Sequence, residues 1–315
     1  MRALHWDGTA ARVIDHADPR ATDGVAVVHV SVAGICNTDL ELVKGYMDFR
    51  GVLGHEFVGT VADGPAAWQG RRVVGEINFA CGHCVWCARG LQRHCPTRRV
   101  MGILDADGAF AEYVAVPLAN LHRIADAVDD EHAVFTEPLA AAFEILDQVA
   151  LAPDADCVVL GDGKLGLLVA QVLSHAGARV LAVGKHTSHL DILRRRGIAT
   201  VEVSAWQRTP ADIVVEATGS SAGLTMAIAA TKPRGTLVLK STVAGAAQLN
   251  LAPLVINEIT VVGSRCGRFA PALAALASGA IDVTSLIAAR RPLSAGVDGL
   301  RCAAEPGALK VLLQP

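Results

Sequence analysis

Residues 157–166 read CVVLGDGKLG, an apolar run of strand type followed at once by three closely spaced glycines. The apolar stretch from Leu167 to Ala176 then continues as a helix. A strand, a Gly-x-Gly-x-x-Gly turn and a helix form the fingerprint of a dinucleotide-binding unit, in which backbone amides at the helix N-terminus approach a pyrophosphate. The turn is expected to supply five cofactor-binding residues, namely Gly161, Gly163, Lys164, Leu165 and Gly166.

The segments after this turn support the same interpretation. Residues 179–183 are apolar and arrive at the spacing that a βαβ unit requires, and residues 212–215, 236–239 and 261–262 continue the alternation. Helices alternating with apolar strands predict a doubly wound parallel sheet of the α/β class. Thr218, shortly after the strand at 212–215, is a further candidate for cofactor contact.

The end of the second strand bears on the choice of cofactor. An NAD-type site places an acidic residue there to hold the ribose 2′-hydroxyl, whereas a basic residue accommodates a 2′-phosphate. Here the strand is followed by Lys185 and His186, which favours NADP over NAD. The alternative is that both side chains point into solvent and that either cofactor is accepted.

Four cysteines, Cys81, Cys84, Cys87 and Cys95, lie within one short segment of the chain. Four thiolates close a tetrahedral shell with no open position, as a structural zinc site requires. The alternative is free thiols or two disulfides, but in a chain without a signal peptide cysteines at this spacing favour metal. The neighbouring histidines are not needed, because four sulfurs already saturate the ion.

A second metal site is predicted from residues 34–39, GICNTD, and residues 54–56, GHE. Thiolate, imidazole and carboxylate all bind Zn²⁺, and catalytic zinc keeps three protein ligands and one open position. Cys36 and His55 supply two ligands, and Glu137 is the expected third, with Glu56 able to replace it. Taken alone, Cys36 and His55-Glu56 would also fit a buried small residue and a turn.

The size of the chain indicates two domains. Its 315 residues exceed the length at which a single core stops growing, and 52% are apolar against 19% charged. Short apolar runs of period two before residue 135, as at 25–32, 59–62, 72–75 and 111–116, predict a β-rich domain. A helix is expected from Glu137 to Val149. The apolar residues 308–313 are too few to fold alone, so the expected division is 1–138 with 267–315, and 139–266.

The charge balance excludes some classes of partner. The 28 basic residues against 31 acidic ones give a net charge of -3 without a long basic run, so no nucleic-acid partner is expected, and a zinc-ribbon nucleic-acid module is disfavoured. The N-terminus lacks an apolar core of signal-peptide length, and no uncharged apolar run is long enough to span a membrane. We therefore expect a soluble, cytoplasmic protein.

These motifs in this order resemble those of the zinc-dependent medium-chain dehydrogenase/reductase superfamily, which includes alcohol, polyol, threonine and glucose dehydrogenases. The resemblance spans nearly the whole chain and implies a GroES-like catalytic domain and a Rossmann domain. It implies two zinc ions, one catalytic and one structural, bound by the residues named above. Thr38 matches the hydroxyl residue that takes the substrate's proton, and Asp39 matches the carboxylate that orients the metal-bound histidine.

One departure concerns proton release. Glu41 stands where several members of the superfamily have a histidine, so the proton passes through Glu41 or leaves directly to water. Tyr46, Met47 and Phe49 lie between the two halves of the catalytic metal motif and are expected either to line a substrate pocket or to belong to the core.

The activity implied by the resemblance is hydride transfer between NAD(P) and an alcohol or ketone, of the secondary alcohol, polyol or sugar type. Zinc would lower the pKa of the reacting hydroxyl, and the nicotinamide would carry out the redox step. A homodimer or homotetramer is implied as well. The alternative is a catalytically silent relative that keeps zinc and nucleotide for a binding or regulatory role.

Overall fold

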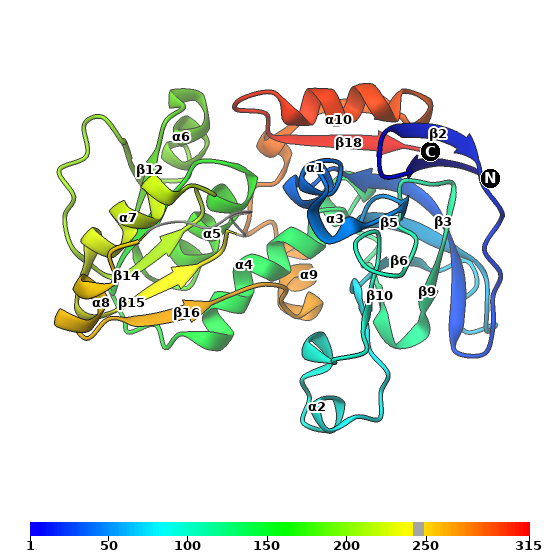
Figure 1. Ribbon diagram of the computed structural model, residues 1–315, viewed down its shortest axis with the longest axis horizontal. Helices are drawn as coiled ribbons and strands as arrows, with labels where there is room; N and C mark the ends of the chain where they lie inside the picture. Colours follow the sequence, from blue (N-terminus) through cyan, green and yellow to red (C-terminus); the bar gives the residue numbers. More distant parts are fainter. Residues whose placement is uncertain (242–248) are drawn as a thin grey trace. The chain divides into compact units, whose positions relative to one another are not determined.

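Figure 1 shows the computed structural model, which describes residues 1–241 and 249–315. The chain forms two compact units. The first comprises Met1–Glu137, Leu276–Ser278 and Leu286–Pro315, and the second comprises Pro138–Ala275 and Gly279–Ser285. No helix in the described part of the chain is both long and apolar enough to cross a bilayer.

The first unit is built on a seven-stranded sheet in which β10, β6, β5, β3, β18 and β17 follow one another and β9 also pairs with β3. Smaller sheets join β2, β1 and β4, and β7 with β8. The strands of this unit are β1 (Arg2–Trp6), β2 (Ala11–Asp15), β3 (Val25–Gly34), β4 (Gly51–Val52), β5 (Glu56–Asp63), β6 (Arg72–Gly75), β7 (Asn78–Phe79), β8 (Arg99–Val100), β9 (Tyr113–Pro117), β10 (Leu121–Arg123), β17 (Ile287–Pro292) and β18 (Lys310–Gln314).

Its helical segments are short. They are α1 (Asn37–Leu42), α2 (Val85–Ala88), α3 (Asp130–Ala133) and α10 (Gly296–Ala304), with 3₁₀ turns η1 (Tyr46–Asp48), η2 (Gln92–His94), η3 (Leu118–Asn120) and η5 (Leu293–Ala295). The predicted β-rich character is confirmed, and β6 has the predicted bounds. The run at 111–116 begins its strand two residues later than expected, because Ala111 instead forms an isolated bridge with Ala3.

The register of β3 gathers distant parts of the chain at one end of this sheet. Gly34, the last residue of β3, is paired with Glu56 at the start of β5 and with Leu312 of β18. A Cβ at Gly34 would lie 2.4 Å from Oε2 of Glu56, so only glycine fits between these side chains. The expected return of the apolar segment 308–313 to the first unit is confirmed, since β18 lies between β3 and β17.

The second unit contains a six-stranded, wholly parallel sheet. Its strand order, β13-β12-β11-β14-β15-β16, corresponds to 3-2-1-4-5-6, the order of a Rossmann fold. The strands are β11 (Asp156–Leu160), β12 (Arg179–Gly184), β13 (Ala199–Glu202), β14 (Ala211–Glu216), β15 (Thr231–Leu239) and β16 (Thr260–Gly263). The predicted fold class is thereby confirmed, including the strand at 261–262, which is part of β16.

Helices connect these parallel strands and cover the sheet. They are α4 (Thr136–Gln148), α5 (Lys164–His175), α6 (Thr187–Arg194), α7 (Ser221–Ala230), α8 (Ala252–Ile256) and α9 (Phe269–Ala277), with the 3₁₀ turn η4 (Thr284–Leu286). The core of α5 is almost continuously apolar and buried from Leu167 to Leu173, because the helix packs on both β11 and β12. The expected helix at 137–149 is α4.

The chain returns from the second unit to the first at a later residue than the sequence indicates. Residues 267–275 and 279–285, expected in the β-rich domain, belong to the second unit. A Cβ at Gly267 would lie 1.8 Å from the carbonyl oxygen of Ala140, so this segment packs directly against α4. Next to it, Arg268 donates two hydrogen bonds to Asp147 at the end of the same helix, at 2.9 and 2.7 Å.

Candidate metal centres and nucleotide site

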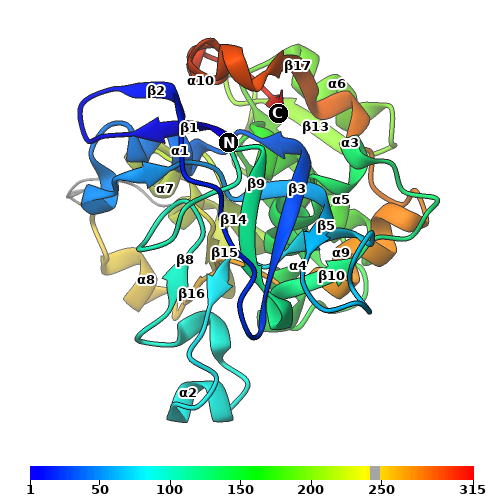
Figure 2. The same cartoon turned by 90° about the vertical axis from the view of Figure 1, so that its right-hand side faces the viewer.

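The four-cysteine segment forms a separate lobe of the first unit. Figures 1 and 2 both show its helix α2 extending away from the sheet. Ligand atoms of Cys81, Cys84, Cys87 and Cys95 all lie within 4.8 Å of one another. None of the eight cysteines of the chain is in a disulfide. The structure therefore brings together all four predicted ligands as free thiols.

The spacing of these sulfurs fits a zinc ion. Four sulfurs at about 2.3 Å from a tetrahedral zinc lie about 3.8 Å from one another. The Sγ atom of Cys84 is 3.5 Å from that of Cys87 and 3.9 Å from that of Cys95, and Cys81 lies 4.0 Å from Cys87. Backbone amides of His83 and then Cys84 lower the pKa of Cys81 to about 6, which favours a thiolate, whereas burial raises the pKa of Cys87 to about 11. A zinc ion bound here would be structural, because it would join the segments that carry the four cysteines.

The second candidate centre lies at the end of β3. Ligand atoms of Cys36, His55 and Glu56 all lie within 4.8 Å of one another. Cys36 is the N-cap of α1, and the other two residues precede and begin β5, so the paired strands determine their proximity. His55 and Glu56 are buried, and Oε1 of Glu56 has no hydrogen-bond partner. An unpartnered buried carboxylate oxygen beside a thiol and an imidazole is a donor set that fits a cation.

The carboxylate of Asp39 lies beside the imidazole of His55. Its Oδ2 accepts a hydrogen bond of 2.8 Å from the backbone amide of Cys36, and its Oδ1 lies 3.3 Å from Nδ1 of His55. Burial lowers the pKa of His55, but the carboxylate of Asp39 and the sulfur of Cys36 outweigh this and raise it well above 6.5. The surroundings thus favour positive charge between Cys36 and His55, where a bound cation would replace the proton.

Glu56 has a partner that the sequence motifs do not reveal. Nζ of Lys310 donates a hydrogen bond to Oε2 of Glu56, and both side chains are almost fully buried. Burial lowers the pKa of Lys310, but Glu56 first, and then Cys36 and Glu137, raise it above its usual value. A lone lysine inside the apolar run 308–313 is the signal that could have identified it, because lysine is rarely buried without a partner.

Glu137 is not part of the group formed by Cys36, His55 and Glu56. Its carboxylate lies near enough to Lys310 to raise the pKa of that ammonium. Its role as third ligand therefore remains a prediction, and the geometry favours Glu56.

The proposed relay residues lie on α1. Oγ1 of Thr38 is 3.8 Å from Sγ of Cys36, so the hydroxyl borders the metal group. Glu41 is three residues further on, which places it on the same helix face as Thr38. Its carboxylate accepts a hydrogen bond of 2.9 Å from Lys44.

The three glycines of the nucleotide turn differ in their surroundings. Gly161 has a φ of +115°, which requires glycine, and a Cβ at Gly166 would lie 1.9 Å from the carbonyl oxygen of Gly161. Nothing lies within 4 Å of a Cβ at Gly163, the N-cap of α5. Tight turn, open approach and close packing are the three roles that the glycines of a dinucleotide site play. Lys164 and Leu165 begin α5 as expected.

The predicted residues beyond the turn lie at the carboxyl ends of neighbouring strands. Lys185 is exposed after β12, and His186 is the N-cap of α6. Thr218 follows β14, where its amide and hydroxyl both donate to Oε1 of Glu216 at 2.6 Å. The sequence motifs did not identify Asp162, which accepts hydrogen bonds from the amides of Lys185 and His186, because it occupies a variable position of the glycine motif. They also did not identify His189, whose Nδ1 lies 2.8 Å from the carbonyl oxygen of Asp162.

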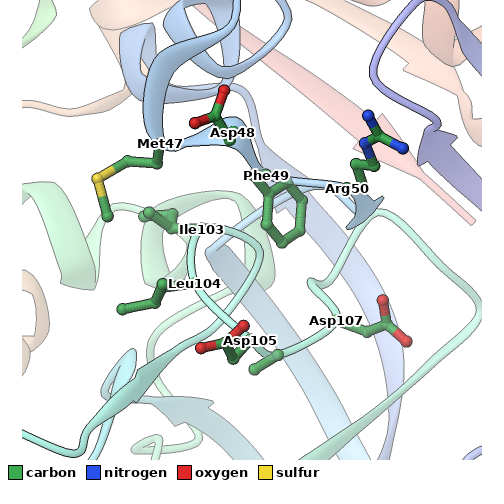
Figure 3. Close-up of a pocket in the computed structure, with 9 residues that line it drawn as sticks. Met47, Asp48, Phe49, Arg50, Ile103, Leu104, Asp105 and Asp107 are labelled. Carbon is green, nitrogen blue, oxygen red and sulfur yellow. The ribbon is translucent and has the colours of Figure 1, made fainter.

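A pocket of about 400 Å³ lies in the first unit (Figure 3). Its walls come from the segment before β4 and from the loop after β8, and its lining residues are Met47, Asp48, Phe49, Arg50, Ile103, Leu104, Asp105, Ala106 and Asp107. Met47 and Phe49 thus line a pocket, although Phe49 is also buried, and Tyr46 is not among the lining residues.

Two family models match the chain. The alcohol dehydrogenase GroES-like domain matches residues 22–126, and the zinc-binding dehydrogenase model matches residues 165–278. D-arabinitol dehydrogenase 1 of Uromyces fabae is 28% identical over 100% of this chain and 97% of its own length. Sorbitol dehydrogenase of Halalkalibacterium halodurans is 28% identical, with 94% of each chain covered.

Solved structures agree with these matches. A zinc-binding dehydrogenase from Sinorhizobium meliloti, solved with NADP bound, superposes with a TM-score of 0.91 at 28% identity, covering 100% of this chain and 99% of the other. Both matched domains, the strand order and the two groups of residues that could bind a metal therefore lead to one assignment. The chain belongs to the zinc-dependent medium-chain dehydrogenase/reductase superfamily.

Proposed function

We propose that this protein is a zinc-dependent dehydrogenase that transfers a hydride between a polyol or related secondary alcohol and NAD(P), with NADP preferred. The observation that carries the proposal is the hydroxyl of Thr38 beside the group formed by Cys36, His55 and Glu56. A metal site bordered by a proton-accepting hydroxyl is suited to deprotonating an alcohol.

The residues of the chain have separate tasks in this reaction. Zinc, when bound by Cys36, His55 and a glutamate, would lower the pKa of the substrate hydroxyl, and the nicotinamide would accept the hydride. Thr38 receives the substrate's proton while its own hydroxyl proton moves on to Glu41 or to water. Oδ1 of Asp39 lies 3.3 Å from Nδ1 of His55, which would leave the other ring nitrogen available to the metal.

We propose that the pocket in Figure 3 receives the substrate, because its polar lining would match a polyol. Asp48, Arg50, Asp105 and Asp107 provide hydrogen-bonding groups around an apolar wall that contains Phe49. Met47 and Asp48 have φ values of 63° and 49°, a strained conformation that is concentrated at ligand sites. Several hydroxyl groups on one substrate would match such a lining, in keeping with the arabinitol and sorbitol dehydrogenases among the relatives.

We further propose two zinc ions per chain and a homodimer. β16 is at the edge of the parallel sheet in the described residues, and Val255, Ile256 and Val261 nearby are 77%, 77% and 43% exposed. Pairing of β16 with its copy in a second chain would cover these apolar side chains. Light scattering of the wild type and of a Val255→Lys, Ile256→Glu variant tests this, because only the variant should be monomeric.

The decisive experiment is an initial-rate panel of polyols, sugars, amino alcohols and simple secondary alcohols with NAD⁺ and with NADP⁺ on zinc-loaded protein. Turnover of a polyol that chelation abolishes is the expected result. Tight nucleotide binding without turnover of any compound would instead support the silent relative, a binding or regulatory protein that retains the fold.

A further inference from the structure

Asp162, the second residue of the glycine-rich turn, ties this turn to the end of the neighbouring strand. Its Oδ2 accepts hydrogen bonds from the backbone amides of Lys185 and His186, at 2.8 and 2.6 Å. Nδ1 of His186 lies 3.1 Å from the same oxygen. The side chain is 9% exposed. One carboxylate oxygen therefore determines the path of the backbone after β12, where the ribose of a dinucleotide is recognised.

The same side chain leaves no room for another at the end of β12. A Cβ at Gly184 would lie 2.5 Å from Cβ of Asp162 and 2.6 Å from its Oδ2. Position 184 directly precedes Lys185 and ends the strand, which is where an NAD-type site carries its acidic residue. The structure thus excludes the usual ribose-binding carboxylate by steric contact.

Both nearby histidines are oriented by Asp162. Nδ1 of His189 lies 2.8 Å from the main-chain carbonyl oxygen of Asp162, which can only accept, so this nitrogen carries a proton. Nδ1 of His186 faces a carboxylate and is a donor for the same reason. The two rings lie 4.6 Å apart. The Nδ1 atoms of both rings are therefore occupied. His186 is only partly buried, so its Nε2 is the ring nitrogen left to bind a ligand.

Ligand atoms of Asp162, His186 and His189 lie within 4.8 Å of one another, a grouping that a metal ion could also use. Oδ2 of Asp162 already receives three N–H groups, and both Nδ1 atoms point toward Asp162. These contacts make the carboxylate an anchor for the loop. The basic side chains beside it, Lys185 and His186, are available to bind an anion.

We propose that Asp162 is a positioning residue that selects a 2′-phosphorylated adenosine ribose, by excluding a side chain from position 184 and by holding His186 so that Nε2, together with Lys185, binds the phosphate. This inference rests on the proposed function, because it concerns the cofactor of that reaction.

The test measures binding of nucleotide fragments, which does not depend on turnover. Calorimetric titration of zinc-loaded protein with 2′,5′-ADP and with 5′-ADP should show about tenfold tighter binding of 2′,5′-ADP, the effect of one charge-assisted hydrogen bond. His186→Ala and Asp162→Ala should each lower this ratio clearly, with the preference that remains due to Lys185. Thr187→Ala, an exposed neighbour whose hydroxyl donates to Glu202, is the matched control and should leave the ratio unchanged.

An exchange of side chains tests the steric part of the proposal. Gly184→Asp alone should lower the melting temperature, because the new Cβ meets Asp162. The double variant Asp162→Gly, Gly184→Asp should fold and prefer 5′-ADP, because a carboxylate then stands at the end of the strand.

Two results would overturn the inference while leaving the proposed function intact. One is equal or tighter binding of 5′-ADP by the wild type, as expected if Asp162 accepts a ribose hydroxyl. The other is an unchanged ratio in His186→Ala, a change at a partly exposed side chain. A wild type that binds neither nucleotide would remove the proposed function and this inference together.

Discussion

Lys310 and Glu56 form a buried ion pair although 254 residues separate them in the sequence. Nζ of Lys310 also lies 3.4 Å from the carbonyl oxygen of Ile35 and 5.7 Å from the centre of the Phe135 ring. The pair occupies Oε2 of Glu56, and Oε1 has no hydrogen-bond partner. The ammonium at Lys310 thereby neutralises one of the negative groups that gather at this end of β3.

We expect Lys310→Met to destabilise the protein by about 3 to 5 kcal/mol, because it leaves the Glu56 carboxylate buried without its partner. Urea denaturation of zinc-loaded protein measures this. The double variant Glu56→Gln, Lys310→Met should recover much of the loss. Lys44→Met, which removes an exposed pair with Glu41, should cost less than about 1 kcal/mol. Equal midpoints for Lys310→Met and wild type would contradict the assigned pair.

Replacement of Thr38 tests proton transfer. Thr38→Val should lower kcat about 10² to 10⁴-fold, because valine has a similar shape but cannot receive or pass on a proton. Thr38→Ser should keep most of the activity. Zinc content and nucleotide affinity of both variants should equal those of the wild type, and activity of the valine variant near the wild-type level would exclude Thr38 as the relay.

The four-cysteine lobe should hold one of two zinc ions. Cys87→Ser is expected to lower the metal content measured by mass spectrometry from two zinc ions per chain to one, and to lower the melting temperature. Cys302→Ser, at a partly buried thiol on α10, is the control and should retain both ions. A Cys87→Ser protein with unchanged metal content would show that the lobe does not bind zinc.

Two glycines of the nucleotide turn should respond differently to the same added methyl group. Gly166→Ala should destabilise the second unit, because its Cβ would meet the carbonyl oxygen of Gly161 at 1.9 Å. Gly163→Ala should fold normally, since nothing lies within 4 Å of its Cβ, but should bind nucleotide at least about tenfold more weakly by blocking the pyrophosphate. Thermal melts and calorimetry distinguish the two effects, and tight binding by Gly163→Ala would place the cofactor elsewhere.

The opposite end of the parallel sheet should make stability depend on pH. Lys232 donates to Asp156 at 3.1 Å and to Asp212 at 2.9 Å, and its ammonium is the largest cause of the lowered pKa of both carboxyl groups. Because their pKa values lie below the ordinary 3.8 in the folded state, this stabilisation is complete above that pH and disappears as pH falls through the folded values.

Lys232→Met should therefore lower stability modestly at pH 7, because solvent screens these partly exposed groups, and by progressively less as the pH falls below 3.8. Melting curves across this range measure the difference. Arg234→Met, which removes an exposed contact of 3.8 Å with Glu258, is the control without such a trend. A difference that does not shrink in acid would mean that Lys232 acts through packing.

Local motifs predicted most of the fold and much of the candidate site. The strands of the parallel sheet could be predicted because each is a short apolar run. The motifs also predicted two separate groups that the structure shows, Cys36 with His55, and the four cysteines of the lobe. Lys310 could not be placed, because its partner depends on the pairing of β18 with β3 rather than on neighbours in sequence. Asp162 was missed for a similar reason, since its role depends on Gly184 in the next strand.

The place of β18 in the first unit also determines the order of events during synthesis. β3 and β5 emerge early from the ribosome, but the strand that lies beside β3 is translated only after the whole second unit. At typical translation rates of 5 to 20 residues per second, the N-terminal strands wait roughly ten seconds or more for it. During that interval the residues of β3 that pair with β18, Ala33 and Gly34, are without that partner strand.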